Sequence, residues 1–235
     1  MGVSGMILVL FVVMTFLARW QNRGAETYVD ALQDVPAFSG KAYVVLNDGV
    51  PVFMQEDLVT QTYELYGPLD ALGRCTSAMA CLGKDLMPTA PRESISHIKP
   101  SGWMQAEYEF VDGKNLYNRC HLIGFQLAGE NDNEKNLITG TRFMNVEGML
   151  PFENMIADYI KGTGNHVLYR VTPIYEGSNL VASGVQLEAM SVEDTGGDIC
   201  INVYIYNNQP GVEIDYATGN SWEADPEQST KSSAA

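Results

Sequence analysis

Two extended segments separated by a tight turn constrain the fold of this chain more than any other feature of its sequence. From Trp103 to Val111, aromatic residues alternate with glutamates, as in a strand with one buried face. Asp112-Gly113 has the composition of a turn, and the run from Leu116 to Ile123 returns as a second strand that carries His121. The sequence therefore predicts a β-hairpin with a histidine on its return strand.

A helix is predicted to follow this hairpin. Pro151 suits the first turn of a helix, where its missing N–H costs nothing, and apolar residues follow it at helical spacing. This stripe, which we interpret as core, consists of Phe152, Met155, Ile156, Tyr159 and Ile160. Glu153 lies off the stripe and is free for another task. Asn145 precedes the proline, so the helix either starts twice or kinks there.

The remaining strands are predicted from runs of β-branched and aromatic residues. Ala42–Leu46 and Val50–Phe53 flank Asn47-Asp48-Gly49, a favourable turn, and should form another hairpin. The stretch from Gly67 to Pro100 predicts short helices and loops. Three further strands should form an antiparallel meander, at Val167–Val171, Leu180–Met190 and Ile199–Tyr206. The expected fold class is α+β, with a mixed, mainly antiparallel sheet.

Several polar residues between positions 119 and 153 have the side chains that phosphodiester hydrolysis needs. An imidazole removes a proton from water, and guanidiniums neutralise charge on the phosphate. Amide and carboxylate oxygens suit one hydrated divalent metal ion. The candidates are Arg119, His121, Asn136, Arg142, Asn145 and Glu153.

The order of these residues carries a resemblance. The segments NRCHLIG, NLITGTRFMN and LPFE resemble the DNA/RNA non-specific endonuclease family, whose finger motif usually reads Asp-Arg-Gly-His. GKDLMPT, KPSGW, NHVLYRVTPIY and QPGVEIDYATG extend the similarity from about Lys41 to Trp222, especially to the secreted or membrane-anchored branch of Gram-positive bacteria. The resemblance implies a ββα-metal finger formed by hairpin and helix. It also implies cleavage of DNA, with RNA left open as a second substrate, leaving 5′-phosphate and 3′-hydroxyl ends.

His121 and Arg119 are the predicted catalytic residues within the motif. The imidazole would act as the general base, since it gains and loses protons near neutral pH. The alternative is a core histidine hydrogen-bonded within a sheet. Arg119 would stabilise charge that develops on the phosphate, or would instead form a structural salt bridge. Arg142 and Asn136 are candidates for binding the substrate or positioning the site.

Asn145 and Glu153 are the residues predicted to hold the metal ion and its water. In the family, the metal-binding asparagine precedes a helical glutamate by the eight residues that also separate this pair. Asn145 would bind Mg²⁺, or Mn²⁺ in its place, and a single protein ligand leaves the ion hydrated, as Mg²⁺ prefers. Glu153, the third catalytic candidate, would hold a metal-bound water. The alternatives are a helix cap at Asn145 and a solvated glutamate at the helix start.

Two residues depart from the usual finger motif. Asn118 stands where aspartate is common, and Cys120 stands where glycine or another small residue is common. An amide still accepts a hydrogen bond, so we expect activity to survive. Cys120 is not expected to act as a nucleophile, because adjacent side chains on a strand point to opposite faces. The rival interpretation is a catalytically impaired nucleic-acid-binding module, which would have no need for His121, Asn145 and Glu153 together.

The net charge of −15 argues against binding DNA through a broad basic surface. Arg119, Arg142 and Arg170 fall in the motif region, whereas acidic residues concentrate elsewhere, including the C-terminal tail. We therefore predict a local positive cleft on an acidic body. The sequence indicates no protein partner.

The N-terminus predicts export. Residues 6–18 form an uncharged apolar run with the length of a signal-peptide core, short for a membrane span. The alternatives are a cleaved signal, an uncleaved anchor that associates with the membrane, or a start codon placed too far downstream. An extracellular or cell-surface protein is expected, with the signal or anchor over 1–25 and a lead-in over 26–40. The nuclease domain is expected over 41–222 and a disordered tail over 223–235.

The four cysteines allow a disulfide without demanding one, and the sequence does not choose among the pairings. They are Cys75, Cys81, Cys120 and Cys200, and the first two are near enough in sequence to bridge locally. No CxxC or Cys/His spacing typical of structural zinc is present. His97 is expected at the surface, and His166 is expected to be structural.

Overall fold

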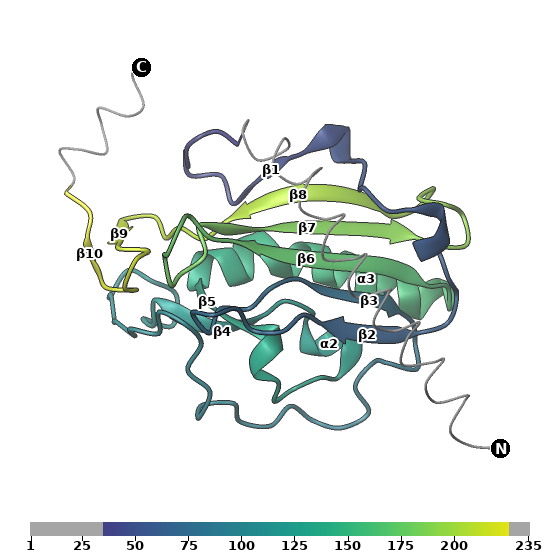
Figure 1. Ribbon diagram of the computed structural model, residues 1–235, viewed down its shortest axis with the longest axis horizontal. Coiled ribbons are helices and arrows are strands. Elements are labelled where there is room, and N and C mark those ends of the chain that lie inside the picture. The colour runs from purple at the N-terminus through teal and green to yellow at the C-terminus, as the bar shows by residue number, and fades with distance from the viewer. Residues whose placement is uncertain (1–34, 226–235) are drawn as a thin grey trace. The chain divides into compact units, whose positions relative to one another are not determined.

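The computed structural model describes residues 35–225, and those from Phe38 onward belong to one compact unit (Figure 1). The expected signal or anchor, most of the lead-in and the tail from residue 226 lie outside the described residues. The strands are β1 (Tyr43–Val45), β2 (Tyr63–Tyr66), β3 (Ala78–Leu82), β4 (Tyr117–His121), β5 (Leu137–Thr141), β6 (Val167–Ile174), β7 (Gly184–Ser191), β8 (Cys200–Tyr206), β9 (Val212–Ile214) and β10 (Ser221–Glu223). The helices and helical turns are η1 (Asn47–Gly49), η2 (Gln55–Asp57), α2 (Phe125–Ala128), η3 (Glu134–Asn136), η4 (Met144–Met149) and α3 (Leu150–Thr163).

Six strands form one antiparallel sheet in the order β1-β8-β7-β6-β3-β2. The predicted meander is its centre, because β6, β7 and β8 pair in succession. β4 with β5 and β9 with β10 form two separate antiparallel pairs. The mainly antiparallel α+β fold is therefore confirmed.

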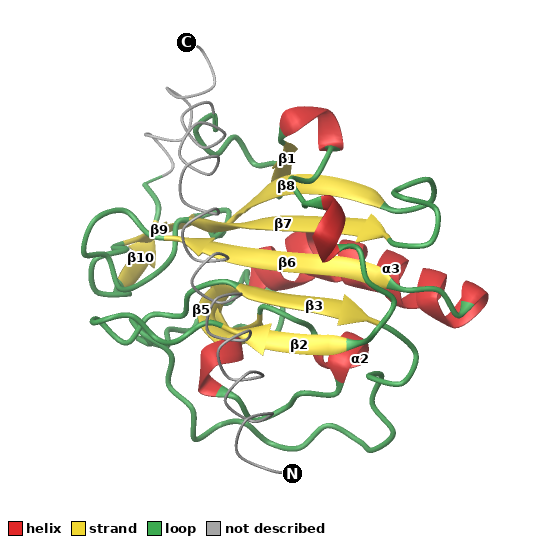
Figure 2. Cartoon of the chain, turned by 45° about the vertical axis from the view of Figure 1, so that its right-hand side comes forward, coloured by secondary structure: helices red, strands yellow, loops and turns green. Residues whose placement is uncertain are grey.

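Helix α3 packs along one face of the large sheet, as the two views in Figures 1 and 2 show. Its buried residues Phe152, Ile156 and Ile160 join a core cluster with strand residues such as Tyr169 and Leu187. The predicted stripe is thus largely core, as expected from its 3.6-residue spacing. Met155 is the exception, because 51% of its surface is exposed.

The strand before the motif was predicted wrongly. Residues 103–111 make only an isolated bridge, Glu107 to Asn115, and β4 pairs instead with β5 downstream. On the outer edge of β4, the side chain of Gln105 donates to the Tyr117 carbonyl at 2.8 Å and accepts from its N–H at 2.9 Å. A side chain therefore replaces the expected strand, while Trp103 and Tyr108 pack in a small second core.

The N-terminal hairpin was also predicted wrongly. β1 pairs with β8, and residues 50–53 form no strand. The amide N–H of Val52 donates to Glu188 Oε1 at 2.8 Å, and Asn202 Nδ2 donates to the Val50 carbonyl at 2.9 Å. Side chains of the central sheet therefore hold this segment in place of a backbone partner.

A wide helical turn precedes α3. The N–H of Leu150 donates to the carbonyl of Asn145, five residues back, and Pro151 follows in the first turn of α3. Proline has no N–H to continue the four-residue bonding pattern at this point, which accounts for the wider turn. Helical hydrogen bonding continues from this wide turn into α3, and Asn145 lies in the wide turn.

The expected boundaries and cysteine chemistry differ in detail. β10 extends to Glu223, so ordered structure continues past the predicted domain end at residue 222. All four cysteines are free thiols, three of them buried, so none of the allowed disulfides forms. Among the described residues, no helix has the length and apolar character needed to span a bilayer.

Candidate active site

A cavity of about 640 Å³ opens beside β4, α2 and the start of α3. Five of the predicted candidates line it: Arg119, His121, Arg142, Asn145 and Glu153. The tertiary structure thus brings together side chains from β4, from the residue that follows β5, from the wide turn and from α3.

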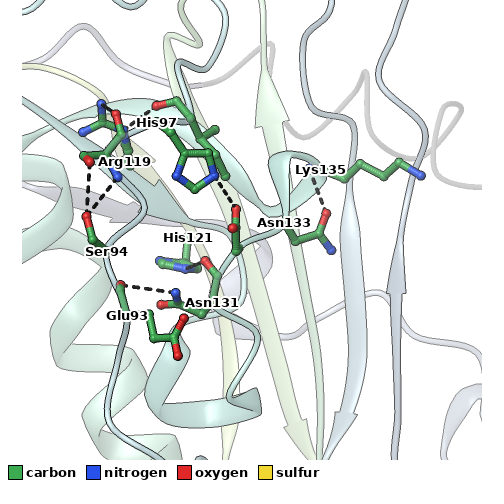
Figure 3. A network of polar contacts seen from close by, with 11 residues as sticks. Glu93, Ser94, His97, Arg119, His121, Asn131, Asn133 and Lys135 are labelled. Atoms are coloured by element: carbon green, nitrogen blue, oxygen red, sulfur yellow. Dashed lines mark hydrogen bonds and ion pairs between the residues drawn. The ribbon is translucent and has the colours of Figure 1, made fainter.

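His121 is the last residue of β4, and only 6% of its surface is exposed. Its Nε2 lies 3.2 Å from the carbonyl oxygen of Asn131, which Figure 3 shows beside the ring. Its Nδ1 lies 3.3 Å from Nη2 of Arg92. A carbonyl only accepts and a guanidinium only donates. Both partners therefore assign the same neutral tautomer, with the proton on Nε2 and a lone pair on Nδ1.

The environment keeps His121 uncharged. Burial, and secondly the positive charge of Arg92, lower the pKa of His121 to about 4, although the Asn131 carbonyl acts in the opposite direction. The imidazole is neutral at physiological pH and able to accept a proton.

Glu153 lies in the first turn of α3 and is 9% exposed. Burial raises the pKa of its carboxyl group to about 7, while Gln126 and Arg92 act to lower it. The carboxylate packs directly on Gly124, where a Cβ would approach within 2.6–2.8 Å of its carboxyl atoms. Any larger residue at position 124 would displace the carboxylate from this position.

Asn145 is half-buried in the wide turn before α3 and lines the cavity. No hydrogen bond joins its side chain to another residue in the described range 35–225. The amide oxygen of Asn145 is therefore available to the cavity rather than used as a helix cap, the alternative weighed from the sequence.

The two predicted arginines have protein partners. Arg119 donates from Nε to the Ile98 carbonyl and from Nη2 to the Ser96 carbonyl at 2.7 Å, and its guanidinium carbon lies 4.2 Å from the centre of the Trp103 ring. Burial lowers the pKa of Arg119. Arg142 donates to Asp112 Oδ2 from Nε at 3.0 Å and from Nη2 at 2.7 Å. Each guanidinium lines the cavity while bracing a neighbouring loop.

Arg92 is a cavity residue that sequence reasoning missed. It lies in a segment without helix, strand or turn, upstream of the motif, yet its guanidinium contacts the His121 ring. No periodicity or local pattern marks such a position, so the sequence holds no signal that distinguishes it from an ordinary surface arginine.

Asn136 does not reach the cavity. It is fully buried, its Oδ1 accepts from the Ile123 N–H at 2.8 Å, and its Nδ2 donates to the Ile123 carbonyl at 3.0 Å. The expected contact with substrate does not fit this geometry, because both ends of the amide are used. The side chain instead fixes the backbone between His121 and Gly124.

The two unusual motif residues are accommodated differently. The Cys120 thiol is fully buried, burial raises its pKa, and it lies where a Cβ on Gly140 would approach within 2.4 Å of Sγ. A glycine on the paired strand thus makes room for the larger side chain, and the thiol is not a nucleophile. Asn118 lines the cavity, and its buried Nδ2 has no hydrogen-bond partner among the described residues.

The other two histidines contact carboxylates outside the cavity lining. His97 Nε2 lies 3.1 Å from Asp132 Oδ1 at the surface, and His166 Nδ1 lies 2.6 Å from Glu193 Oε1. Both positions agree with the expected surface and structural roles.

Comparison with known proteins gives two sequence findings. The model of the DNA/RNA non-specific endonuclease family matches residues 55–193. A deoxyribonuclease of Streptococcus dysgalactiae subsp. equisimilis is 29% identical over 206 residues, covering 70% of this chain and 62% of that protein. The chain thus spans less than two thirds of the length of this relative.

Two examples of solved structures that share the fold are NucA and Sda1 nuclease. NucA from Streptococcus agalactiae, crystallised with no metal bound, is 25% identical with a TM-score of 0.71, over 83% of this chain and 93% of NucA. Sda1 nuclease with a bound zinc ion is 30% identical with a TM-score of 0.61, over 69% of this chain and 82% of Sda1.

Proposed function

Because this chain belongs to the DNA/RNA non-specific endonuclease family, we propose that the cavity beside β4 hydrolyses phosphodiester bonds of DNA. The observation that carries the proposal is the convergence of His121, Asn145 and Glu153 with three arginines on one cavity. The arginines offer local positive charge to phosphates on a chain of net charge −15. Since phosphate contacts carry no sequence information, we expect little sequence preference, and RNA is an additional substrate to be tested.

In this proposal, His121 is the general base. Its Nδ1 lone pair is directed toward Arg92, which also lines the cavity. The Asn131 carbonyl fixes the proton on Nε2. A bound phosphate would attract the Arg92 guanidinium and free Nδ1 to take a proton from the attacking water. Arg92 would then neutralise charge that develops on the phosphate.

Arg119 and Arg142 have more restricted roles in this proposal. Their guanidiniums are partly used by loop carbonyls and by Asp112. We assign Arg119 to the phosphate charge as a secondary partner beside Arg92, and Arg142 to the flanking backbone of the substrate. Asn136 is assigned to positioning rather than binding, because its amide holds Ile123.

The residues present fit a divalent metal ion. Asn145 offers an amide oxygen that is not used by the protein, and Glu153 is a buried carboxylate that forms no ion pair within the described residues. Hard oxygen donors of this kind suit Mg²⁺, with Mn²⁺ as a substitute. Such an ion would neutralise phosphate charge and make a bound water more acidic. Glu153 would orient that water, with its charge favoured by the cation.

Export is also part of the proposal. It rests on the apolar run of residues 6–18, which lies outside the described residues. The mature protein would then act on extracellular or surface-associated DNA.

The test is a plasmid-nicking assay with the chain from Glu26 onward. We expect nicked and linear plasmid with Mg²⁺ or Mn²⁺ and intact plasmid in excess chelator. Binding of plasmid without any cleavage would favour the rival, a nucleic-acid-binding module with impaired catalysis.

A further inference from the structure

Asn131 connects the two loops that hold the ring nitrogens of His121 (Figure 3). Its backbone carbonyl accepts from His121 Nε2 at 3.2 Å, and its side-chain Nδ2 donates to the Glu93 carbonyl at 3.2 Å. Glu93 directly follows Arg92, whose Nη2 lies 3.3 Å from His121 Nδ1. These four residues form a closed ring of contacts around the imidazole.

The segment that carries Arg92 depends on this link. Residues 91–95 form no helix, strand or turn, and Arg92 and Glu93 are exposed. Among the described residues, the backbone of Arg92 and Glu93 makes one hydrogen bond, the one that Asn131 donates. A long side chain on a loosely held backbone samples many rotamers, so the Asn131 bond limits where the guanidinium can lie.

We propose that the Asn131 side chain is a positioning residue, which fixes the spacing between the Arg92 guanidinium and the His121 imidazole by holding the Glu93 carbonyl. The proposal rests on the proposed nuclease function. Asn131 does not line the cavity, so it would act through Arg92 and His121 rather than through contact with DNA.

The molecule contains a matched control for this link. His97 Nε2 and Asp132 Oδ1 join the same two loops at 3.1 Å, but their side chains are 62% and 54% exposed. Exposed contacts of this kind contribute little to stability. No hydrogen bond or salt bridge in the described structure joins either side chain to Arg92 or His121. Asp132→Ala therefore removes a link at the neighbouring position without opening the ring of contacts.

The first test is a double-mutant cycle on plasmid cleavage. Asn131→Ala should lower kcat by about 10- to 100-fold with little change in KM, because a displacement of about 1 Å costs a rate factor of this size. Asp132→Ala should change kcat by less than about threefold. In an Arg92→Ala background, Asn131→Ala should also change kcat by less than about threefold, because its proposed target is already absent.

A second measurement is independent of catalysis, so it separates failure of this proposal from failure of the proposed function. ¹⁵N relaxation of the Arg92 guanidinium should show an ordered side chain in wild type and in Asp132→Ala, and a mobile one in Asn131→Ala. Asn131→Asp keeps the size of the side chain but loses the N–H donor, so it should behave like Asn131→Ala. It can be measured in place of Asn131→Ala if the alanine variant does not fold. Unchanged Arg92 mobility, or equal loss of kcat in both backgrounds, would overturn the proposal.

Discussion

Two regions of the unit contain the same kinds of polar side chain and use them in opposite ways. On the sheet face away from α3, Arg170, Glu188 and Asn202 lie directly opposite one another on β6, β7 and β8. Arg170 Nη2 lies 2.6 Å from Glu188 Oε2, and the polar groups of this row also bind the backbone of Val50 and Val52. Around the cavity, Arg92, Glu153 and Asn145 have far fewer protein partners.

The difference shows that residue types do not identify a site. A buried carboxylate with an arginine and an asparagine is a structural clamp where the groups satisfy one another. Where they are brought together without mutual pairing, they are available to a ligand, and burial of the unpaired Glu153 carboxylate raises the free energy of the folded state. Arg170, grouped with the motif arginines from the sequence, belongs to the clamp.

The largest effect is expected at the base. His121→Gly should lower kcat by about two to four orders of magnitude, the usual scale for a general base, while the variant stays folded. Added imidazole should restore part of the rate, increasing with its neutral fraction as pH passes about 7. Cleavage kinetics and metal titration check this. Lost metal binding would make His121 a ligand, and undiminished cleavage would remove it from the active site.

The two asparagines should separate activity from stability. Asn145→Ala should lower activity by about 100-fold or more with little change in Tm, because its side chain has no hydrogen bond to lose. Asn202→Ala should destabilise by about 1–3 kcal/mol, since it leaves buried partners unsatisfied, without changing kcat. Thermal melts and cleavage rates on both variants test the pair. A fully active Asn145→Ala in trace metal would contradict the metal assignment.

The two buried glutamates should respond oppositely to substitution by glutamine, measured in chelator. Burial raises the pKa of Glu153 from 4.5 to about 7, so the folded protein binds the extra proton and this group's contribution to stability falls as pH rises through that interval. The free energy of unfolding of Glu153→Gln, relative to wild type, should therefore increase by on the order of 2–4 kcal/mol as pH rises from 4.5 to 8. Glu188→Gln, which breaks a buried ion pair, should lose about 3 kcal/mol. Urea unfolding at a series of pH values tests both variants. Stability changes of the same sign in the two variants would contradict the contrast between the two glutamates.

The smallest effect concerns salt. Because DNA binding is assigned to a few cavity arginines, log Kd should change with log salt as for about two to four phosphate contacts. Arg92→Ala should reduce that slope by about one, and Arg170→Ala should leave it unchanged. Fluorescence anisotropy of a labelled duplex with His121→Gly protein and Mg²⁺ measures it. A steep slope, or an effect at Arg170, would indicate a different binding surface.

The two wrong hairpins show where local patterns stop being informative. Asn47-Asp48-Gly49 and Asp112-Gly113 do turn the chain, but neither brings its flanking segments together as paired strands. β1 pairs with β8, and β4 pairs with β5, because partners are chosen by the packing of the whole sheet. A side chain, Gln105, satisfies the edge where a strand was expected.

Several residues that the sequence proposed for the site line one cavity, but its internal arrangement was not predicted. His121, Asn145 and Glu153 reach one cavity as the spacing indicated. Their assigned roles stay predictions until tested. Asn136 and Arg92 could not be placed, because the sequence does not show whether a polar side chain is buried among backbone groups or lines a cavity.

By itself, the sequence determined some of the elements, namely the meander and the helix after Pro151. It also determined the order of the histidine, asparagine and glutamate along the chain. These follow from local periodicity and spacing. Only the tertiary structure decided that Arg92 lies beside the base and that Arg170 is paired elsewhere. The physical reason is that the fate of a polar side chain depends on which partners remain unsatisfied after packing, and those partners come from distant segments.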